Sequence, residues 1–340
     1  MSRAPLQVLG ADSMKIPQDP LEGKKVLITG VAGFIGSWMA EALCDAGALV
    51  TGIDNFSTGT ENNLKGLTRR GNFRFEACDI VKGDIKSVDG GNLDYVLHLA
   101  SRPSPDDYSR NQIDTLLVNS IGTSNILELA RKHDSRVLFT STSEIYGNAS
   151  VIPTPETYFG YVNPTGEMSA YKESKRFGES LCVAYHRTYG IDVRIARPFN
   201  TYGPRIDPKS DYDRVIARFV KQALAGRPIT VHGDGSQSRS FCYISDAVAG
   251  LVSFLVARTP EKVLNIGSDK EISILSLARL VKRVVKSSSS ITFVDARKDD
   301  VQRRCPDITK AKATLEWEPA VSLSEGLRRT ARWWTKQKWA

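Results

Sequence analysis

The chain of 340 residues predicts an α/β protein built on a doubly wound parallel sheet, because apolar strands alternate with amphipathic helices up to Pro198. Several of these strands are continuously apolar, as expected where helices cover both faces of a sheet. A glycine-rich turn joins the first strand to the first helix. These three observations predict a sheet domain over the first part of the chain.

The first predicted strand is Lys24–Thr29, which is a short apolar run that ends at Gly30. An amphipathic helix then fits Ile35–Ala46, and the second strand fits Ala48–Asp54. The same alternation continues through strands at Phe73–Ala77, Tyr95–Ala100, Arg136–Ser141 and Asp192–Arg197, and through helices near Val118–His133 and over Tyr171–Tyr189.

After Pro198 the texture changes to glycine, proline and charged loops between shorter elements. We predict an N-terminal extension at residues 1–23 and a sheet domain formed by 24–198 plus 241–263. Residues 199–240 plus 264–335 are expected to form a smaller C-terminal substrate-binding lobe. A ligand should lie in the crevice between the two parts.

The composition excludes several classes of protein. Hydrophobic residues make up 41% of the chain and charged residues 25%, which is ordinary for a globular protein. Ser253 interrupts the longest apolar stretch, Ala247–Ala257, which is too short to span a membrane, and the N-terminus lacks an apolar signal core. We therefore expect a cytoplasmic protein with no membrane partner.

The spacing of the cysteines and histidines does not indicate a metal site or a disulfide. The five cysteines are scattered without a CxxC pair, and the four histidines lack metal-ligand spacing. The net charge of +8 is spread along the chain without a basic tail. This favours an anionic small molecule over nucleic acid, and we expect no metal site.

The glycine turn has the spacing of a dinucleotide site. Gly30, Gly33 and Gly36 form G-x-x-G-x-x-G between the first strand and first helix, where backbone amides can approach a pyrophosphate at the helix N-terminus. Asp54 follows 18 residues after Gly36, at the end of the second strand. A carboxylate there binds ribose hydroxyls and repels a 2′-phosphate, so the pattern predicts a Rossmann-like NAD site rather than an NADP site. The alternative is a structural glycine turn with a capping aspartate.

A second pattern suggests proton transfer. Tyr171 and Lys175 are four residues apart and share one face of a helix, where an ammonium beside a phenol favours the phenolate and makes it a base. Upstream, the hydroxyl of Thr142 follows a strand and can orient a substrate hydroxyl towards Tyr171. Alone, the Tyr–Lys pair fits a solvated surface equally well. Together with the glycine turn, it favours catalysis.

These residues lie in longer motifs: GVAGFIG, HLAS, STSEIYG, YKESK, RPFNTYGPR, ITVHGDGSQSRSF and RRCPDI. With them the chain resembles the extended short-chain dehydrogenase/reductase family of nucleotide-sugar enzymes over roughly residues 24–335. Within that family it is most similar to the UDP-glucuronate decarboxylases, through LFTSTSEIYG, ETYFGYVNPTG, RIARPFNTYGPR and DDVQRRCPDI.

The resemblance implies oxidation of the sugar at C4 by NAD⁺, loss of CO₂ from the C5 carboxylate and return of the hydride, giving UDP-xylose. It implies catalytic roles for Thr142, Glu144, Tyr171, Lys175 and Arg304. It also implies that Arg304 contacts the substrate, and that Tyr171 and Lys175 contact the cofactor. The other substrate contacts would be Asn200, Val215, Thr230 and Arg239, and the other cofactor contacts Gly30, Gly33, Phe34, Ile35, Gly36, Asp54, Asn55, Asp79, Ile80, Leu99, Ala100 and Asn119. The family is also typically homodimeric through helices, here those near 105–131 and 171–188.

The chain departs from the decarboxylase pattern at basic positions. Met168 replaces the usual arginine three residues before Tyr171, and Asp114 and Leu117 replace lysines. Arg102 is an additional cation in the preceding loop, and we expect it to compensate by pairing with the sugar carboxylate. Two alternative activities remain open: a nucleotide-sugar 4-epimerase, and a 4,6-dehydratase, although Ser143 stands where a dehydratase has aspartate. A non-catalytic NAD-binding sensor is a further alternative.

Overall fold

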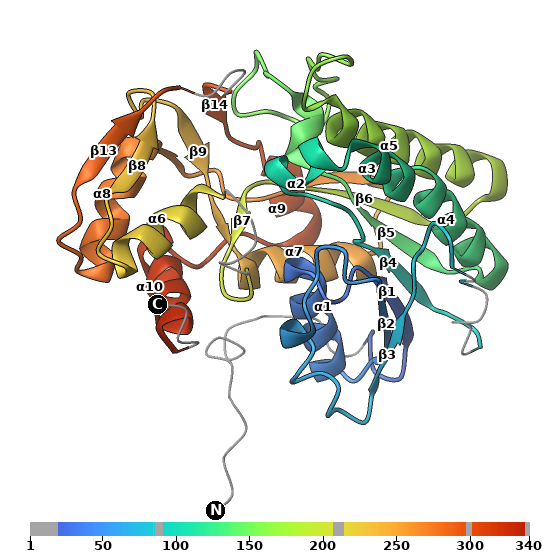
Figure 1. Cartoon of the computed structure of the whole chain (residues 1–340). Coiled ribbons are helices and arrows are strands. Elements are labelled where there is room, and N and C mark those ends of the chain that lie inside the picture. Colours follow the sequence, from blue (N-terminus) through green and yellow to red (C-terminus); the bar gives the residue numbers. More distant parts are fainter. Residues whose placement is uncertain (1–19, 84, 86–90, 207–213, 297–300, 337–340) are drawn as a thin grey trace, which may run out of the picture.

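A seven-stranded parallel sheet forms the centre of the computed structural model, which describes residues 20–83, 85, 91–206, 214–296 and 301–336 (Figure 1). The strand order is β11-β6-β5-β4-β1-β2-β3, and every neighbouring pair is parallel. The order changes direction between β1 and β4, which opens a crevice at the carboxyl ends of these strands. The predicted doubly wound sheet is confirmed. Its strands are β1 Lys25–Thr29, β2 Leu49–Asp54, β3 Phe73–Ala77, β4 Tyr95–His98, β5 Arg136–Thr140, β6 Val193–Pro198 and β11 Val263–Ile266.

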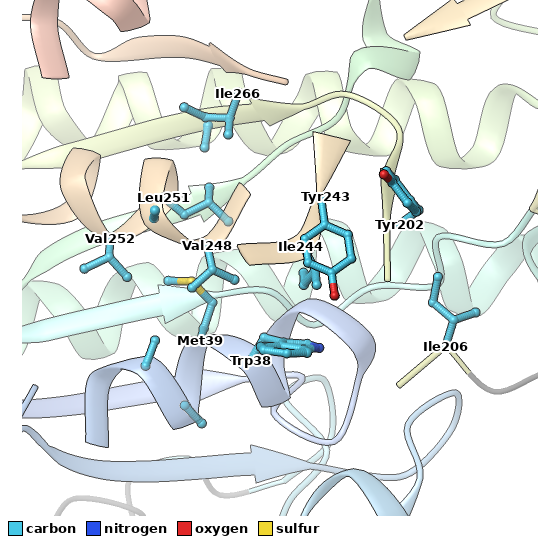
Figure 2. Close-up of a cluster of buried hydrophobic side chains, with 14 of the residues drawn as sticks. Trp38, Met39, Tyr202, Ile206, Tyr243, Ile244, Val248, Leu251, Val252 and Ile266 are labelled. Atoms are coloured by element: carbon cyan, nitrogen blue, oxygen red, sulfur yellow. The ribbon is translucent and has the colours of Figure 1, made fainter. Parts of the chain in front are cut away.

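Helices cover both faces of this sheet (Figure 1). On one face, Leu138 of β5 belongs to a buried cluster with Met39 and Val248, part of which Figure 2 shows. On the other face, Phe139 packs in a separate cluster with Ile126. Burial on both sides explains why the strands are continuously apolar. The covering helices are α1 Phe34–Asp45 and α7 Ile244–Val256 on the first face, and α3 Gln112–Asn119, α4 Ile121–His133 and α5 Ser169–Tyr189 on the second, with the short α2 Pro105–Arg110 beside α3 and α5.

The remaining elements build the smaller part of the molecule from three small sheets and four helices among the described residues. Strand β9 pairs in parallel with β14, and the register sets Arg304 directly opposite Arg239. This pairing brings two arginines that are far apart in the sequence side by side on neighbouring strands. The elements are β7 Thr201–Tyr202, α6 Val215–Leu224, β8 Ile229–His232, β9 Ser238–Ser240, β10 Cys242–Tyr243, β12 Glu271–Ser273, α8 Ile274–Val285, β13 Ile291–Val294, β14 Arg303–Arg304, α9 Thr309–Leu315 and α10 Leu323–Lys336.

Two of the predicted boundaries that are wrong have local reasons. The helix expected near Val118–His133 begins earlier, at Gln112, and breaks at Ser120, whose hydroxyl donates to the carbonyl of Leu116 at 2.6 Å. The strand expected to reach Ala100 ends at His98. There the N–H of Leu99 is shared between the carbonyl and the hydroxyl of Thr29, and the N–H of Ala100 donates to the hydroxyl alone.

Most of the predicted N-terminal extension, residues 1–19, lies outside the described residues. Within the part of the chain that the structure describes, no helix is long and apolar enough to cross a membrane. The division into a sheet domain and a lobe stays a prediction.

Candidate active site

One cavity of about 490 Å³ runs along the carboxyl edge of the sheet, from the glycine turn to the arginines of the smaller part. Most of the residues predicted from the sequence line it. They are Gly30, Gly33, Phe34, Ile35, Gly36, Asp54, Asn55, Asp79, Ile80, Leu99, Ala100, Thr142, Glu144, Tyr171, Lys175, Asn200, Val215 and Arg239.

The glycine turn is too tight for side chains. A Cβ on Gly36 would lie 2.1 Å from the carbonyl oxygen of Gly30, and Gly30 itself has a φ of +72° and packs on the backbone of Ala100. The turn leads directly into α1, a helix of 12 residues whose first three residues line the cavity. This geometry fits the pyrophosphate of a dinucleotide.

Asp54 is fixed beside this turn at the end of β2. Its carboxylate accepts the N–H groups of Ala32 at 2.9 Å and Phe56 at 2.8 Å. Burial raises the pKa of the Asp54 carboxyl, while these backbone N–H groups counter the rise. A carboxylate held in this position can accept ribose hydroxyls, and its charge opposes a 2′-phosphate. The residues therefore fit NAD.

Asp79 brings a second carboxylate to the same end of the cavity. It accepts the N–H of Val81 at 2.8 Å and the side-chain amide of Asn55 at 3.2 Å.

Among the described residues, no group of three or more histidine, cysteine, aspartate or glutamate side chains is arranged to hold a metal ion.

Lys175 is buried at the floor of the cavity, with only 2% of its surface exposed. Its Nζ donates to the carbonyl of Thr140 at 2.8 Å and lies 4.9 Å from the ring centroid of Phe139. Burial lowers the pKa of Lys175 to about 7. The hydrogen bond ties α5 to the end of β5, so the Tyr171–Lys175 face of the helix meets the strand end that carries Thr142.

Tyr171 is also buried, and its ring is stacked on that of Tyr108 from α2. The ring centroids are 5.0 Å apart and the planes differ by 5°. Tyr108 lines the cavity as well. Sequence reasoning missed Tyr108, although Pro105 followed by two aspartates is a helix-start signal that could have revealed α2.

Glu144 belongs to a short 3₁₀ helix, Ser143–Tyr146, that follows β5, and Thr142 is the N-cap of this helix. The hydroxyl of Thr142 accepts the N–H of Glu144 at 3.2 Å. The Glu144 carboxylate is bound by both terminal nitrogens of Arg304, one of them at 3.2 Å. Burial acts to raise the pKa of Glu144, but the charges of Arg304 and Lys172 outweigh it and leave the pKa below its usual value. Glu144 is thus an ionised carboxylate at neutral pH.

Three predicted residues do not line the cavity: Arg304, Asn119 and Thr230. Arg304 is connected to the cavity by its hydrogen bonds to Glu144, which lines it. Asn119 is fully buried behind the cavity, where it donates to Ser174 and accepts from Ser101, both at 3.0 Å. Thr230 is paired through its backbone and hydroxyl with the side chain of Gln222.

The cavity lining carries three guanidinium groups. Arg214, Arg218 and Arg239 all line it, together with His232, and the Arg214 guanidinium lies 5.8 Å from the ring centroid of Phe34 at the start of α1. Sequence reasoning missed the first two arginines, although their spacing at the start of α6, next to Val215, puts them on one helix face. Guanidinium groups along the lining suit the phosphates of an anionic ligand.

Arg102 and Met168 are two of the positions at which the chain departs from the decarboxylase pattern. Arg102 lines the cavity, but its Nη1 donates to both carboxylate oxygens of Asp107, at 2.8 and 3.0 Å, and its Nη2 lies 3.7 Å from Asp114. Met168 stands outside the lining, where its sulfur accepts from the Ser109 hydroxyl at 3.7 Å. Arg102, which we expected to pair with a sugar carboxylate, is therefore already paired with Asp107.

The NAD dependent epimerase/dehydratase family matches residues 26–267. UDP-glucuronic acid decarboxylase 1 of Xenopus tropicalis is 44% identical over 314 residues, covering 92% of this chain and 73% of the relative. The Arabidopsis thaliana protein of the same name is 45% identical over 305 residues, covering 90% of this chain and 68% of the relative.

Among solved structures, UDP-glucuronic acid 4-epimerase from Bacillus cereus in complex with UDP-glucuronic acid and NAD has a TM-score of 0.81 at 31% identity. It covers 92% of this chain and 99% of its own. The family match spans the glycine turn, the Tyr–Lys helix and the whole central sheet. The chain belongs to the NAD dependent epimerase/dehydratase family.

Proposed function

We propose that this enzyme converts UDP-glucuronate to UDP-xylose and CO₂ through a 4-keto sugar. The observation that carries the proposal is the Glu144–Arg304 pair, which stands at the same cavity as Tyr171 and Lys175. The relatives named UDP-glucuronic acid decarboxylase support the same reaction.

Tyr171 is the base in this proposal and removes the proton of the sugar C4 hydroxyl. Lys175 favours the phenolate from the next turn of the helix, and Thr142 orients the C4 hydroxyl towards Tyr171. NAD⁺, when bound, would supply the acceptor for the C4 hydride and the donor that returns it. The glycine turn, Asp54, Asn55, Asp79 and Ile80 would hold it.

The C4 ketone lies β to the C5 carboxylate, so loss of CO₂ leaves a stabilised enolate. Arg304 binds the substrate carboxylate in this proposal, and Glu144, once Arg304 is engaged, takes up a proton from solvent and delivers it to C5. Their mutual pairing keeps Glu144 ionised until substrate enters, and a substrate carboxylate competes with Glu144 for Arg304. Release of neutral CO₂ moves the charge from the carboxylate to the enolate, and protonation at C5 then neutralises it.

The arginines of the cavity lining hold the UDP moiety in this proposal. Arg214, Arg218 and Arg239 bind the diphosphate, and Asn200 is oriented for a phosphate or ribose contact by its bond to the Ser240 carbonyl at 3.0 Å. Val215 and Thr230 contact the nucleotide of the substrate in this proposal. Asn119 supports the nicotinamide end from behind.

A nucleotide-sugar 4-epimerase is the second candidate, and one observation favours it. Met168 stands where the decarboxylases carry an arginine, and it lies outside the cavity lining. The structure of the Bacillus cereus UDP-glucuronic acid 4-epimerase is also similar to this one.

We further propose that the protein is a cytoplasmic homodimer in which α3 and α5 pack against their copies. Three large apolar side chains on these helices support this, since Ile113, Leu116 and Phe177 are 68%, 39% and 50% exposed. We also propose the domain division 24–198 plus 241–263 and 199–240 plus 264–335.

One experiment separates the two candidate activities. The protein is incubated with UDP-glucuronate, with and without added NAD⁺, and the product is analysed by mass spectrometry. Loss of the mass of CO₂ supports decarboxylation, whereas an unchanged mass with inverted C4 supports epimerisation. An unchanged substrate would contradict both.

A further inference from the structure

We infer that Tyr108 and Arg102 are positioning residues for Tyr171: Arg102 anchors α2, and α2 holds the Tyr108 ring against the ring of the base. The inference deepens the proposed function and rests on it, because it assigns Tyr171 as the base. It replaces the expectation that Arg102 pairs with the sugar carboxylate.

The stack itself leaves Tyr171 little freedom. Tyr171 and Tyr108 are 5% and 3% exposed, and their rings are nearly parallel with centroids 5.0 Å apart. A ring covered on one face by a buried ring cannot turn about its Cβ–Cγ bond without displacing that neighbour. Tyr108 therefore sets the plane of the Tyr171 ring and excludes water from one of its faces.

The helix that carries Tyr108 needs external anchors. With six residues, α2 is far too short to be stable alone. Arg102 binds Asp107 through both carboxylate oxygens, and the side-chain amide of Asn111 donates to the same Asp107 at 3.0 Å. The Arg102 contact fixes α2 to the loop after β4, and the Asn111 contact holds the Asp107 carboxylate from the C-terminal end of α2.

The charges around Arg102 oppose a role as carboxylate receptor. Its guanidinium faces Asp107 and Asp114, so the group of three carries one negative charge overall. A sugar carboxylate approaching this group would meet net repulsion. The structure thus assigns Arg102 a contact within the protein, and loss of it should affect the chemical step rather than substrate affinity.

The test compares Y108L, Y108F, R102A and the double variant R102A/Y108L, with R110A as a matched control at the exposed end of the same helix. For each, kcat, KM for UDP-glucuronate, NAD⁺ affinity and Tm are measured. Misplacement of a reacting group by about 1 Å costs on the order of 100-fold in rate. We expect Y108L to lower kcat by about 10- to 100-fold with KM within about twofold of the wild type.

Y108F keeps the ring and should retain most of kcat, and R110A should match the wild type. R102A should lower kcat less than Y108L does, and the double variant should be no slower than Y108L, since both substitutions act through the same stack. A raised KM with unchanged kcat in R102A would overturn the inference and restore the carboxylate contact. So would a Y108L enzyme with wild-type kcat.

A readout independent of turnover keeps the two proposals distinguishable. In crystal structures of the variants, the Tyr171 ring should be displaced in Y108L and unmoved in Y108F. If the wild type does not act on UDP-glucuronate but the ring moves as expected, the proposed function fails and the positioning role stands. An unmoved ring in Y108L would overturn the positioning role whatever the activity.

Discussion

Replacement of Lys175 by methionine should change how stability depends on pH, because the fold buries this ammonium. Burial lowers the pKa of Lys175 from 10.5 to about 7. Between these values the unfolded chain holds a proton that the folded chain has lost, so stability rises with pH. At about 1.36 kcal/mol per pKa unit, the full effect is at most roughly 5 kcal/mol.

The measurement is the free energy of unfolding in urea, for wild type and K175M, from about pH 6 to about pH 10. The difference between the two proteins removes the contribution of the other titrating groups. We expect the wild type to gain stability relative to K175M across this range. The exposed Lys65 provides the matched control, and K65M should follow the wild type at every pH. A difference between wild type and K175M that stays flat, or falls as pH rises, would refute the reasoning.

Three other substitutions test the cofactor and reaction ends of the cavity. Gly36→Ala places a Cβ 2.1 Å from a backbone oxygen and should weaken NAD⁺ binding in a calorimetric titration by more than about tenfold, whereas Gly66→Ala, with open space around it, should not. Asp54→Ala removes the carboxylate that opposes a 2′-phosphate, so the ratio of NAD⁺ to NADP⁺ affinity should fall by about tenfold, and an unchanged ratio would exclude that role. Arg304→Ala leaves its partner carboxylate buried without its hydrogen-bonded cation, so kcat should fall by about 100-fold and the acid limb of its pH profile should move to higher pH. The exposed neighbour Arg303 is the control for this last change, and a profile shifted equally by R303A would contradict the assignment.

The parts of the fold that the sequence predicted are those with a strong local pattern. The apolar run of β1 and the glycines after it specify a strand, a turn and a helix without help from the rest of the chain. Phe73–Ala77 was likewise predicted with both ends correct. The helix expected over Tyr171–Tyr189 begins at Ser169, but its C-terminal end is correct, because Gly190 takes the left-handed conformation that stops a helix.

The parts that failed depend on contacts between distant residues. No local pattern shows that Thr29 takes the amides beyond His98, or that β9 and β14 align Arg239 with Arg304. The same holds for Tyr108, because its role follows from a stack across two helices rather than from its own neighbours in the chain.

Charge pairing was also beyond the sequence. Arg102 could be recognised as an additional cation, but only the structure shows that Asp107 and Asp114 already surround it. Residue types therefore predicted which groups reach the cavity better than they predicted what each group binds there.

The central claim is that the Tyr171 phenol removes the proton from the sugar C4 hydroxyl. The most direct measurement compares CO₂ release from UDP-glucuronate by wild type and Y171F, after their bound NAD⁺ has been shown to be equal. The account predicts a loss of at least about 100-fold with cofactor content unchanged. Turnover by Y171F within a few-fold of the wild type would contradict it.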